Sequence, residues 1–304
     1  MMSTVLIILP VFFIIASGWA CKKFRIVDEV WIEVLNKFAY YVSLPALIVT
    51  SFWTIDFLHP GSVRLMIESA LTSVGIVLVL WAIIALLPLS PKLKSSILLV
   101  AVTGNTVYMG FPIIGSAFGD QLLSLGTLAA TIYLIVPLLL TIGAIQWWVS
   151  SEHSFISQLV SFVKNPLFIA AVVGVALSFV HSNLLLLHTL RQALVMVGST
   201  ASPVALFALG AFLYKRFLKR RVGLVVSASL LKVVVMPLGL LALGVSGTLL
   251  SWTPLLVIIA AMPIAVTTFV VAQQFKLDET LVSNALLVST VLSFVTIPLI
   301  ISFL

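Results

Sequence analysis

The sequence has little charge, few acidic side chains and one cysteine, Cys21. Only 8% of its 304 residues are charged, whereas 62% are hydrophobic. A soluble domain carries roughly 25% charged and roughly 45–50% apolar residues, so this composition excludes a water-soluble enzyme. A single cysteine also excludes an intramolecular disulfide framework and a cysteine-rich metal site. The composition therefore predicts an integral, all-helical membrane protein.

The sequence lacks the motifs of several other functional classes. No G-x-x-x-x-G-K-[ST] sequence is present, which excludes ATP-driven pumping by this chain. The four histidines lie in or near predicted loops without a ligand-like cluster, so we predict no metal and no cofactor. The net charge of +7 reflects basic loops kept on the cytoplasmic face of a membrane protein, so we expect no nucleic-acid partner.

The first apolar run has the features of a membrane helix and not of a secretory signal. Met1–Thr4 carry no basic side chain, and Lys22, Lys23 and Arg25 follow the run. A secretory signal has the opposite order, with positive charge before the apolar stretch and small residues after it. We therefore interpret this segment as a first span whose N-terminus lies outside the cytoplasm.

Hydropathy and helix breakers predict ten membrane-spanning helices. A helix that crosses a ~30 Å hydrocarbon core needs about 20 residues, so ten of them fill roughly two thirds of the chain. The expected spans are 4–21, 33–52, 63–87, 96–117, 121–148, 165–183, 189–213, 222–246, 253–275 and 281–303.

The basic residues predict the orientation. With the N-terminus outside, 12 of the 16 Lys and Arg residues fall in loops on one side, which the positive-inside rule assigns to the cytoplasm. An even number of spans then places both termini outside the cytoplasm. The prediction is a multi-pass protein of the plasma or inner membrane, surrounded by membrane lipids.

The two halves of the chain carry prolines in the same order. Pro45 in the second span has a counterpart in Pro203 of the seventh, and Pro112 in the fourth has one in Pro263 of the ninth. Because each half holds an odd number of spans, the second half must be inverted relative to the first. Inverted repeats are typical of secondary transporters. The two repeats are predicted at residues 1–150 (helices 1–5) and 151–304 (helices 6–10).

The fourth and ninth spans contain residues that interrupt a helix. Pro112 follows Gly104 and Gly110 in the fourth span, and Pro263 interrupts the ninth. Proline lacks an N–H and clashes with the carbonyl four residues earlier, while glycine loosens the helix. In lipid the freed backbone groups need partners, so paired breaks predict a buried site where half-helix N-termini bind an anion. The alternative is an ordinary proline kink.

These motifs resemble those of the auxin efflux carrier family, which includes bacterial organic-acid carriers and plant PIN-type carriers. The resemblance runs the length of the chain and implies ten helices in a five-plus-five inverted repeat, in which broken helices four and nine cross. It also implies transport of carboxylate-bearing solutes. The matching stretches are Leu35-Asn36-Lys37-Phe38 with Pro45-Ala46-Leu47, Gly104-Asn105 with Gly110-x-Pro112, Pro203 with Gly210, Pro263 with Ala272, and Ser289-Thr290-x-Leu292-Ser293 with Pro298-Leu299.

Two departures from the plant members bear on the substrate. The plant members have Asn-Pro-Asn-x-Tyr at the crossing, whereas here Gly104 precedes Asn105 and the tyrosine is Tyr108. Their long cytoplasmic loop between helices five and six is short here. A small mono- or dicarboxylate therefore fits this chain better than auxin does.

Two ionisable side chains inside predicted spans are functional candidates, because a charge at mid-bilayer costs at least ~2.5–3.5 kcal/mol on insertion scales. Lys232 lies near the centre of the eighth span, where it could neutralise a substrate carboxylate, or pair with an acid such as Glu68 and titrate. Its alternative is to snorkel to the interface. Glu68, one turn after Arg64, is a candidate for proton or cation coupling or one half of an i,i+4 pair.

Polar groups near the breaks complete the predicted site. Asn105 needs partners for its amide, and hydroxyl side chains could contact substrate or pack helices together. Glu33 and Lys37 are interpreted as an interfacial i,i+4 pair, and Tyr133 and Gln146 are weaker candidates. The predicted substrate-binding residues are Gly104, Asn105, Tyr108, Gly110, Pro112, Lys232, Pro263, Thr267, Thr268, Ser289 and Thr290.

The leading hypothesis is a secondary carrier of small organic anions that works by alternating access. The membrane potential opposes anion entry by about 2.3 kcal/mol per charge per 100 mV, so uptake would need H⁺ or Na⁺, whereas export could run as uniport. The alternatives are an intramembrane enzyme acting on a lipid or prenyl substrate, which the singly scattered acids do not support, and a channel or sensor. The oligomeric state is open, with a homodimer as one alternative.

Overall fold

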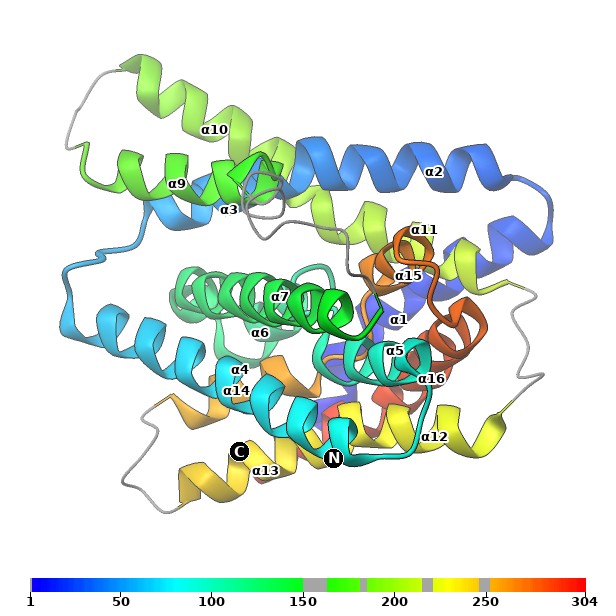
Figure 1. Ribbon diagram of the computed structural model, residues 1–304. Coiled ribbons are helices and arrows are strands. Elements are labelled where there is room, and N and C mark those ends of the chain that lie inside the picture. The colour runs from blue at the N-terminus through cyan, green and yellow to red at the C-terminus, as the bar shows by residue number, and fades with distance from the viewer. Residues whose placement is uncertain (1, 150–162, 181–184, 215–220, 246–251) are drawn as a thin grey trace.

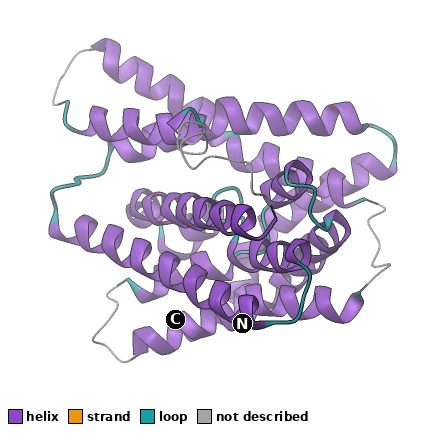
Figure 2. Cartoon of the chain, in the orientation of Figure 1, coloured by secondary structure: helices purple, strands orange, loops and turns teal. Residues whose placement is uncertain are grey.

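The computed structural model describes residues 2–149, 163–180, 185–214, 221–245 and 252–304. Helices dominate these ranges (Figure 2). The one pairing of extended backbone within them is an isolated antiparallel bridge between Gly104 and Ile264. Seven helical segments within the described ranges are long and apolar enough to cross a membrane, and Pro166–Ser178 is a shorter apolar helix. The prediction of an all-helical integral membrane protein is confirmed.

One group of helices, here called the panel, consists of two packed helix pairs and the helical segments that are joined to them along the chain. Helix α1 packs against α11, and α9 packs against α3. Helices α2, α3, α9 and α10 lie together along one side of the molecule in Figure 1. The panel comprises α1 (Met2–Lys23), α2 (Glu29–Phe38), the π-helical segment η1 (Ala39–Ser43), α3 (Leu44–Trp53), α9 (Pro166–Ser178), α10 (Leu185–Ser199) and α11 (Ala201–Leu213).

The remaining helices form a second group, here called the crossing bundle. Helix α7 packs against α4, α5 and α6, while α16 packs against α12, α14 and α15. The crossing bundle comprises α4 (Pro60–Leu86), α5 (Pro91–Val102), α6 (Gly110–Phe118), α7 (Asp120–Val149), α12 (Val222–Leu230), the π-helical segment η2 (Leu231–Val235), α13 (Met236–Val245), α14 (Thr253–Ala261), α15 (Val266–Gln274) and α16 (Glu279–Phe303).

The predicted breaks in the fourth and ninth spans are confirmed. Helix α5 ends at Val102 and α6 begins at Gly110, while α14 ends at Ala261 and α15 begins at Val266. The half-helices α5 and α14 are the most enclosed parts of the fold: every residue of 95–102 and of 255–261 is buried. Non-helical backbone at membrane depth is tolerated only where protein or water surrounds it, and this enclosure meets that condition.

Helices α1 and α11 approach closely because each contributes a glycine that faces the backbone of the other helix. A Cβ atom on Gly18 would overlap the carbonyl of Phe207, and one on Gly210 would overlap the carbonyl of Ile15. Small residues of this kind let membrane helices pack at short range, where van der Waals contact replaces the hydrophobic effect as the driving force.

We predict that Gly210→Ala lowers the free energy of unfolding by about 1–3 kcal/mol, because the added methyl forces α1 and α11 apart. Gly75→Ala is the matched control, since no atom lies within 4 Å of a Cβ at that position. The apparent melting temperatures of the two purified variants check this. Equal melting temperatures would show that α1 and α11 can accommodate the added methyl group without loss of stability.

Candidate functional site

The two breaks meet each other. The links 103–109 and 262–265 run antiparallel where Gly104 faces Ile264, and the Asn105 N–H donates to the Pro263 carbonyl at 2.6 Å. The Asn105 carbonyl in turn accepts from the N–H groups of Met109 and Gly110, at 3.3 and 3.2 Å. Each link therefore supplies partners for backbone groups that the interrupted helices leave unpaired.

Local sequence explains where each helix stops and restarts. Pro112 lies in the first turn of α6, where its missing N–H costs nothing because first-turn N–H groups have no helical acceptor. Pro263 lies within the other link and can only accept a hydrogen bond. Gly104 leaves little room for a side chain, since a Cβ would lie 3.1 Å from the Lys232 ammonium nitrogen and 3.3 Å from Thr106 Cγ2, and these side chains would have to shift.

The carbonyl end of α14 is capped by a cation. The Lys232 ammonium, 4% exposed, donates to the Ala260 carbonyl at 2.7 Å. The carbonyl end of α5 is capped by Thr103, whose hydroxyl donates to the Leu99 carbonyl and contacts the Thr268 hydroxyl at 2.7 Å. Helix C-termini carry partial negative charge, so an ammonium at one of them is stabilised.

Helix α16 supports the second link through its hydroxyl side chains. The Ile264 N–H donates to Ser289 Oγ at 3.1 Å, and Ser289 donates to the Leu286 carbonyl. The Thr290 hydroxyl donates to the same carbonyl, at 2.8 Å. Ser289 therefore fixes the link, whereas Thr290 bonds within its own helix.

A cavity of about 1010 Å³ extends from the crossing to the ends of α2, α9 and α15. Its closed end is lined by Gly104, Asn105, Tyr108 and Thr267. Its mouth is lined by polar residues, among them Lys37, Gln146, Asn165 and Gln274. The Lys37 and Glu33 side chains form a 2.6 Å ion pair there and are 65% and 64% exposed.

The closed end presents hydrogen-bond donors that have no partner in the described part of the chain. Asn105 is 3% exposed, and its side-chain amide makes no hydrogen bond to any described residue. The N–H groups of Val266 and Thr267, at the start of α15, also lack an acceptor among the described residues. A helix N-terminus carries partial positive charge, so these groups together form an environment suited to an anion.

The structure brings most of the predicted site residues to the crossing, in two layers. Gly104, Asn105, Tyr108 and Thr267 line the cavity. The other predicted residues of the crossing do not line the cavity: they lie in the links or in the helices around them, and Thr290 bonds only within its own helix. They are Gly110, Pro112, Lys232, Pro263, Thr268, Ser289 and Thr290.

Glu68 lies apart from the cavity. Its buried carboxylate accepts from Arg64 Nε at 2.8 Å and from the Trp252 N–H at 3.0 Å, at the N-terminus of α14. A carboxylate is stabilised at that end of a helix, so Glu68 holds α4 against α14. Lys232 bonds to Ala260, and no described carboxylate, Glu68 included, forms an ion pair with it.

Sequence reasoning missed an amide–phenol contact at the mouth of the cavity. Asn165 Nδ2 donates to the Tyr40 hydroxyl at 3.1 Å, and Asn165 Oδ1 caps the start of α9. The two residues are 125 positions apart, so no local pattern relates them. The unpaired N–H groups of α15 were also missed, because backbone donors leave no mark on side-chain patterns.

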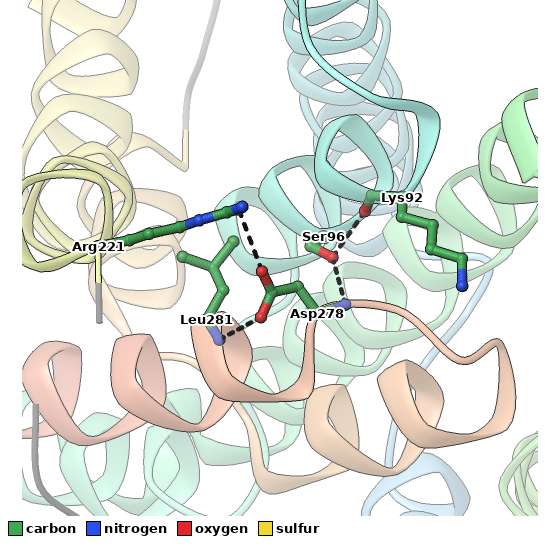
Figure 3. Close-up of polar contacts among 5 residues, drawn as sticks. All are labelled: Lys92, Ser96, Arg221, Asp278 and Leu281. Carbon is green, nitrogen blue, oxygen red and sulfur yellow. Dashed lines mark hydrogen bonds and ion pairs between the residues drawn. The ribbon is translucent and has the colours of Figure 1, made fainter. Parts of the chain in front are cut away.

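A polar cluster ties three helix starts of the crossing bundle together (Figure 3). Arg221, just before α12, pairs with Asp278 at 3.2 Å, and the Asp278 carboxylate accepts from the Leu281 N–H at the start of α16. The Asp278 N–H donates to Ser96 Oγ of α5, which itself donates to the Lys92 carbonyl. These contacts join α5, α12 and α16 into one unit.

Comparison with known proteins assigns the family. The membrane transport protein family matches this chain over residues 4–154 and 150–301. The chain belongs to this family, and the resemblance to auxin efflux carriers is confirmed. The protein is therefore a membrane transport protein.

Relatives of similar length share this class. An uncharacterized transporter of Methanocaldococcus jannaschii is 24% identical, with 96% of each chain covered. A Rhizobium meliloti protein named "Putative malonate transporter" is 28% identical over 96% of this chain and 92% of its own. An uncharacterized transporter of Methanothermobacter thermautotrophicus is also 28% identical, over 96% of this chain and 95% of its own.

We predict that Ser289→Ala lowers the free energy of unfolding by about 1–3 kcal/mol, because the buried Ile264 N–H loses its acceptor. Ser293→Ala is the control: that serine is equally buried, but its hydroxyl bonds only to the Thr290 carbonyl of its own helix. Denaturant unfolding of both variants measures the difference. A loss as large in Ser293→Ala would argue against a special role for the Ser289 contact.

Proposed function

We propose that this protein is a secondary carrier of small organic anions, and not an enzyme, that binds its substrate at the closed end of the cavity. The observation that carries the proposal is the set of unpartnered donors there: the Asn105 amide and the N–H groups of Val266 and Thr267. Buried polar groups are nearly always hydrogen-bonded to protein or water, so donors that face a cavity without a protein acceptor are available to a ligand that supplies acceptors.

The chemistry of the closed end favours a carboxylate. Its backbone N–H groups belong to the N-terminus of a half-helix, the arrangement with which broken-helix carriers bind anionic substrate groups. The Thr267 hydroxyl and the Tyr108 hydroxyl add further donors. No described acidic side chain lines this end, since the one carboxylate at the cavity, Glu33, lies at the mouth in its pair with Lys37.

The substrate class we propose is a small mono- or dicarboxylate. The name of the Rhizobium meliloti relative supports this class, because malonate is a small dicarboxylate. The departures from the plant motif at Gly104 and Tyr108 argue against auxin.

We propose further that the chain spans the membrane ten times, as a five-plus-five inverted repeat of residues 1–150 and 151–304. Reciprocal close contacts between the two halves support a two-fold axis that relates them. Gly18 of α1 packs on Phe207 of α11, and Gly174 of α9, 156 positions after Gly18, packs on Phe52 of α3, 155 positions before Phe207. Such reciprocity is expected when a two-fold axis relates the halves.

A contact between equivalent positions supports the same axis. Ser43, at the end of η1, and Thr200, between α10 and α11, share a 2.7 Å hydrogen bond and are 157 positions apart. Residues related by a two-fold axis can touch each other only where they lie close to it.

The transport cycle we propose moves the crossing bundle against the panel. With both termini outside the cytoplasm, the mouth at the ends of α2, α9 and α15 faces inward, so the structure is a cytoplasm-open state. The cluster of Arg221, Asp278 and Ser96 keeps the bundle together as it moves. Uptake against the membrane potential would require a coupled H⁺ or Na⁺, whereas export needs none.

The orientation can be tested by cysteine labelling in a Cys21→Ser background, which removes the single native cysteine. We predict that Leu58→Cys, at a position 77% exposed between α3 and α4, reacts only from outside the cell. Ser90→Cys, exposed before α5, should react only from the cytoplasm. Reaction of both with an impermeant reagent from one side would contradict the ten-span arrangement.

The site can be tested by Asn105→Ala. We predict that this variant folds but binds malonate, or the carboxylate that shifts the melting temperature most, with an affinity weaker by about 1–3 kcal/mol. Thermal-shift titration of purified protein measures this, because a ligand of the folded state raises its stability. Asn284→Ala, at a buried amide of α16 outside the cavity, should bind as wild type does. Unchanged affinity in Asn105→Ala would place the site elsewhere.

A further inference from the structure

The ammonium of Lys232 lies directly behind the proposed substrate site. Lys232 belongs to η2, where the π-helical turn interrupts the eighth span, and its Nζ bonds to the Ala260 carbonyl at 2.7 Å. Gly104 separates it from the cavity, and a Cβ at Gly104 would lie 3.1 Å from Nζ and 3.2 Å from Cε. Gly104 lines the cavity and has no side chain, so its backbone lies between this charge and the cavity.

This position is where a carrier would bind a coupling cation. In carriers built from broken helices, half-helix C-termini and unwound carbonyls coordinate Na⁺ or H⁺ beside the substrate. Here the C-terminal end of α14 holds the Lys232 ammonium instead. When protonated, Lys232 in that place repels a second cation, and inside a protein this repulsion is several-fold stronger than in water.

The remaining groups at the crossing offer a cation little else. Na⁺ and other hard cations prefer several oxygen ligands, usually with a carboxylate among them. The hydroxyls of Thr103 and Ser289 already donate to helix carbonyls, and each also contacts a second partner. Among the described residues no carboxylate borders the links, and the buried Glu68 is bound to Arg64 and Trp252.

We infer that the Lys232 ammonium takes the place of a coupling cation, so that carboxylate binding at the crossing is independent of Na⁺. The inference rests on the proposed function and specifies its counter-ion. A bound monocarboxylate is then neutralised by a charge that belongs to the protein. Lys232 acts through the field at the site and is not in contact with the substrate, so it is a positioning and neutralising residue.

The test is a thermal-shift titration of purified full-length protein with malonate in sodium, potassium or choline chloride at one ionic strength. We expect the apparent Kd of wild type to agree within about twofold in the three salts. Lys232→Gln should bind at least about tenfold more weakly in all of them. Lys94→Gln is the matched control, since Lys94 also donates to a helix carbonyl, that of Ala85 at 2.7 Å, but lies outside the crossing. It should bind as wild type does.

A second variant separates lost charge from lost folding. Lys232→Ala opens space for a small cation, so methylammonium should restore at least half of its lost affinity on a logarithmic scale. Tetramethylammonium is too large and cannot donate a hydrogen bond to Ala260, so it should restore none. Rescue in the same sample shows that the variant is folded and that the missing group is a hydrogen-bonding cation.

Three results would overturn the inference. They are malonate binding by wild type that requires Na⁺, wild-type affinity in Lys232→Gln, and affinity in Lys232→Ala that methylammonium leaves unchanged. A wild type that binds no small carboxylate in any salt would instead contradict the proposed function itself, and the inference would fall with it. The two failures are therefore distinguishable in one set of titrations.

Discussion

Backbone groups freed by the breaks at 103–109 and 262–265 have no water to bond to in a bilayer, and each link supplies partners to the other. The Asn105 N–H bonds to the Pro263 carbonyl, and Ser289 takes the Ile264 N–H. Leaving such groups unpaired in lipid costs several kcal/mol each. The meeting of the two breaks therefore supplies part of the missing partners, and the residues of α5 and α14 that lead into the breaks, 95–102 and 255–261, are all buried.

The crossing separates positive from negative helix ends. The N-terminus of α15 faces the cavity with the N–H groups of Val266 and Thr267, whereas the C-terminus of α14 faces away from it and is capped by Lys232. An anion in the cavity therefore meets donors in front and a cation behind. One backbone arrangement thus explains both the unpartnered Asn105 amide and a lysine buried in a membrane protein, two features that would each be costly without a ligand.

Much of this arrangement could be predicted, because prolines and glycines act locally. Pro112 and Pro263 marked the two breaks, each of which lies at or just before its proline. For most helices, the ends predicted from hydropathy differ from the observed ends by only a few residues. The i,i+4 pair of Arg64 and Glu68 follows from helix periodicity, but the contact of Glu68 with Trp252 does not, since it joins residues 184 positions apart. The π-helical segments, the division into panel and crossing bundle, and the place of Lys37 at the cavity mouth depend on tertiary packing, which a single sequence leaves undetermined.

The central claim is that substrate crosses the membrane through alternating exposure of the site at Asn105. Counterflow in proteoliposomes tests it most directly, with vesicles preloaded with unlabelled malonate and diluted into trace labelled malonate without an ion gradient. The account predicts that label transiently accumulates inside above its equilibrium level in wild type, and far less in Asn105→Ala. Simple equilibration of label, with no overshoot at any preloaded carboxylate, would contradict a carrier.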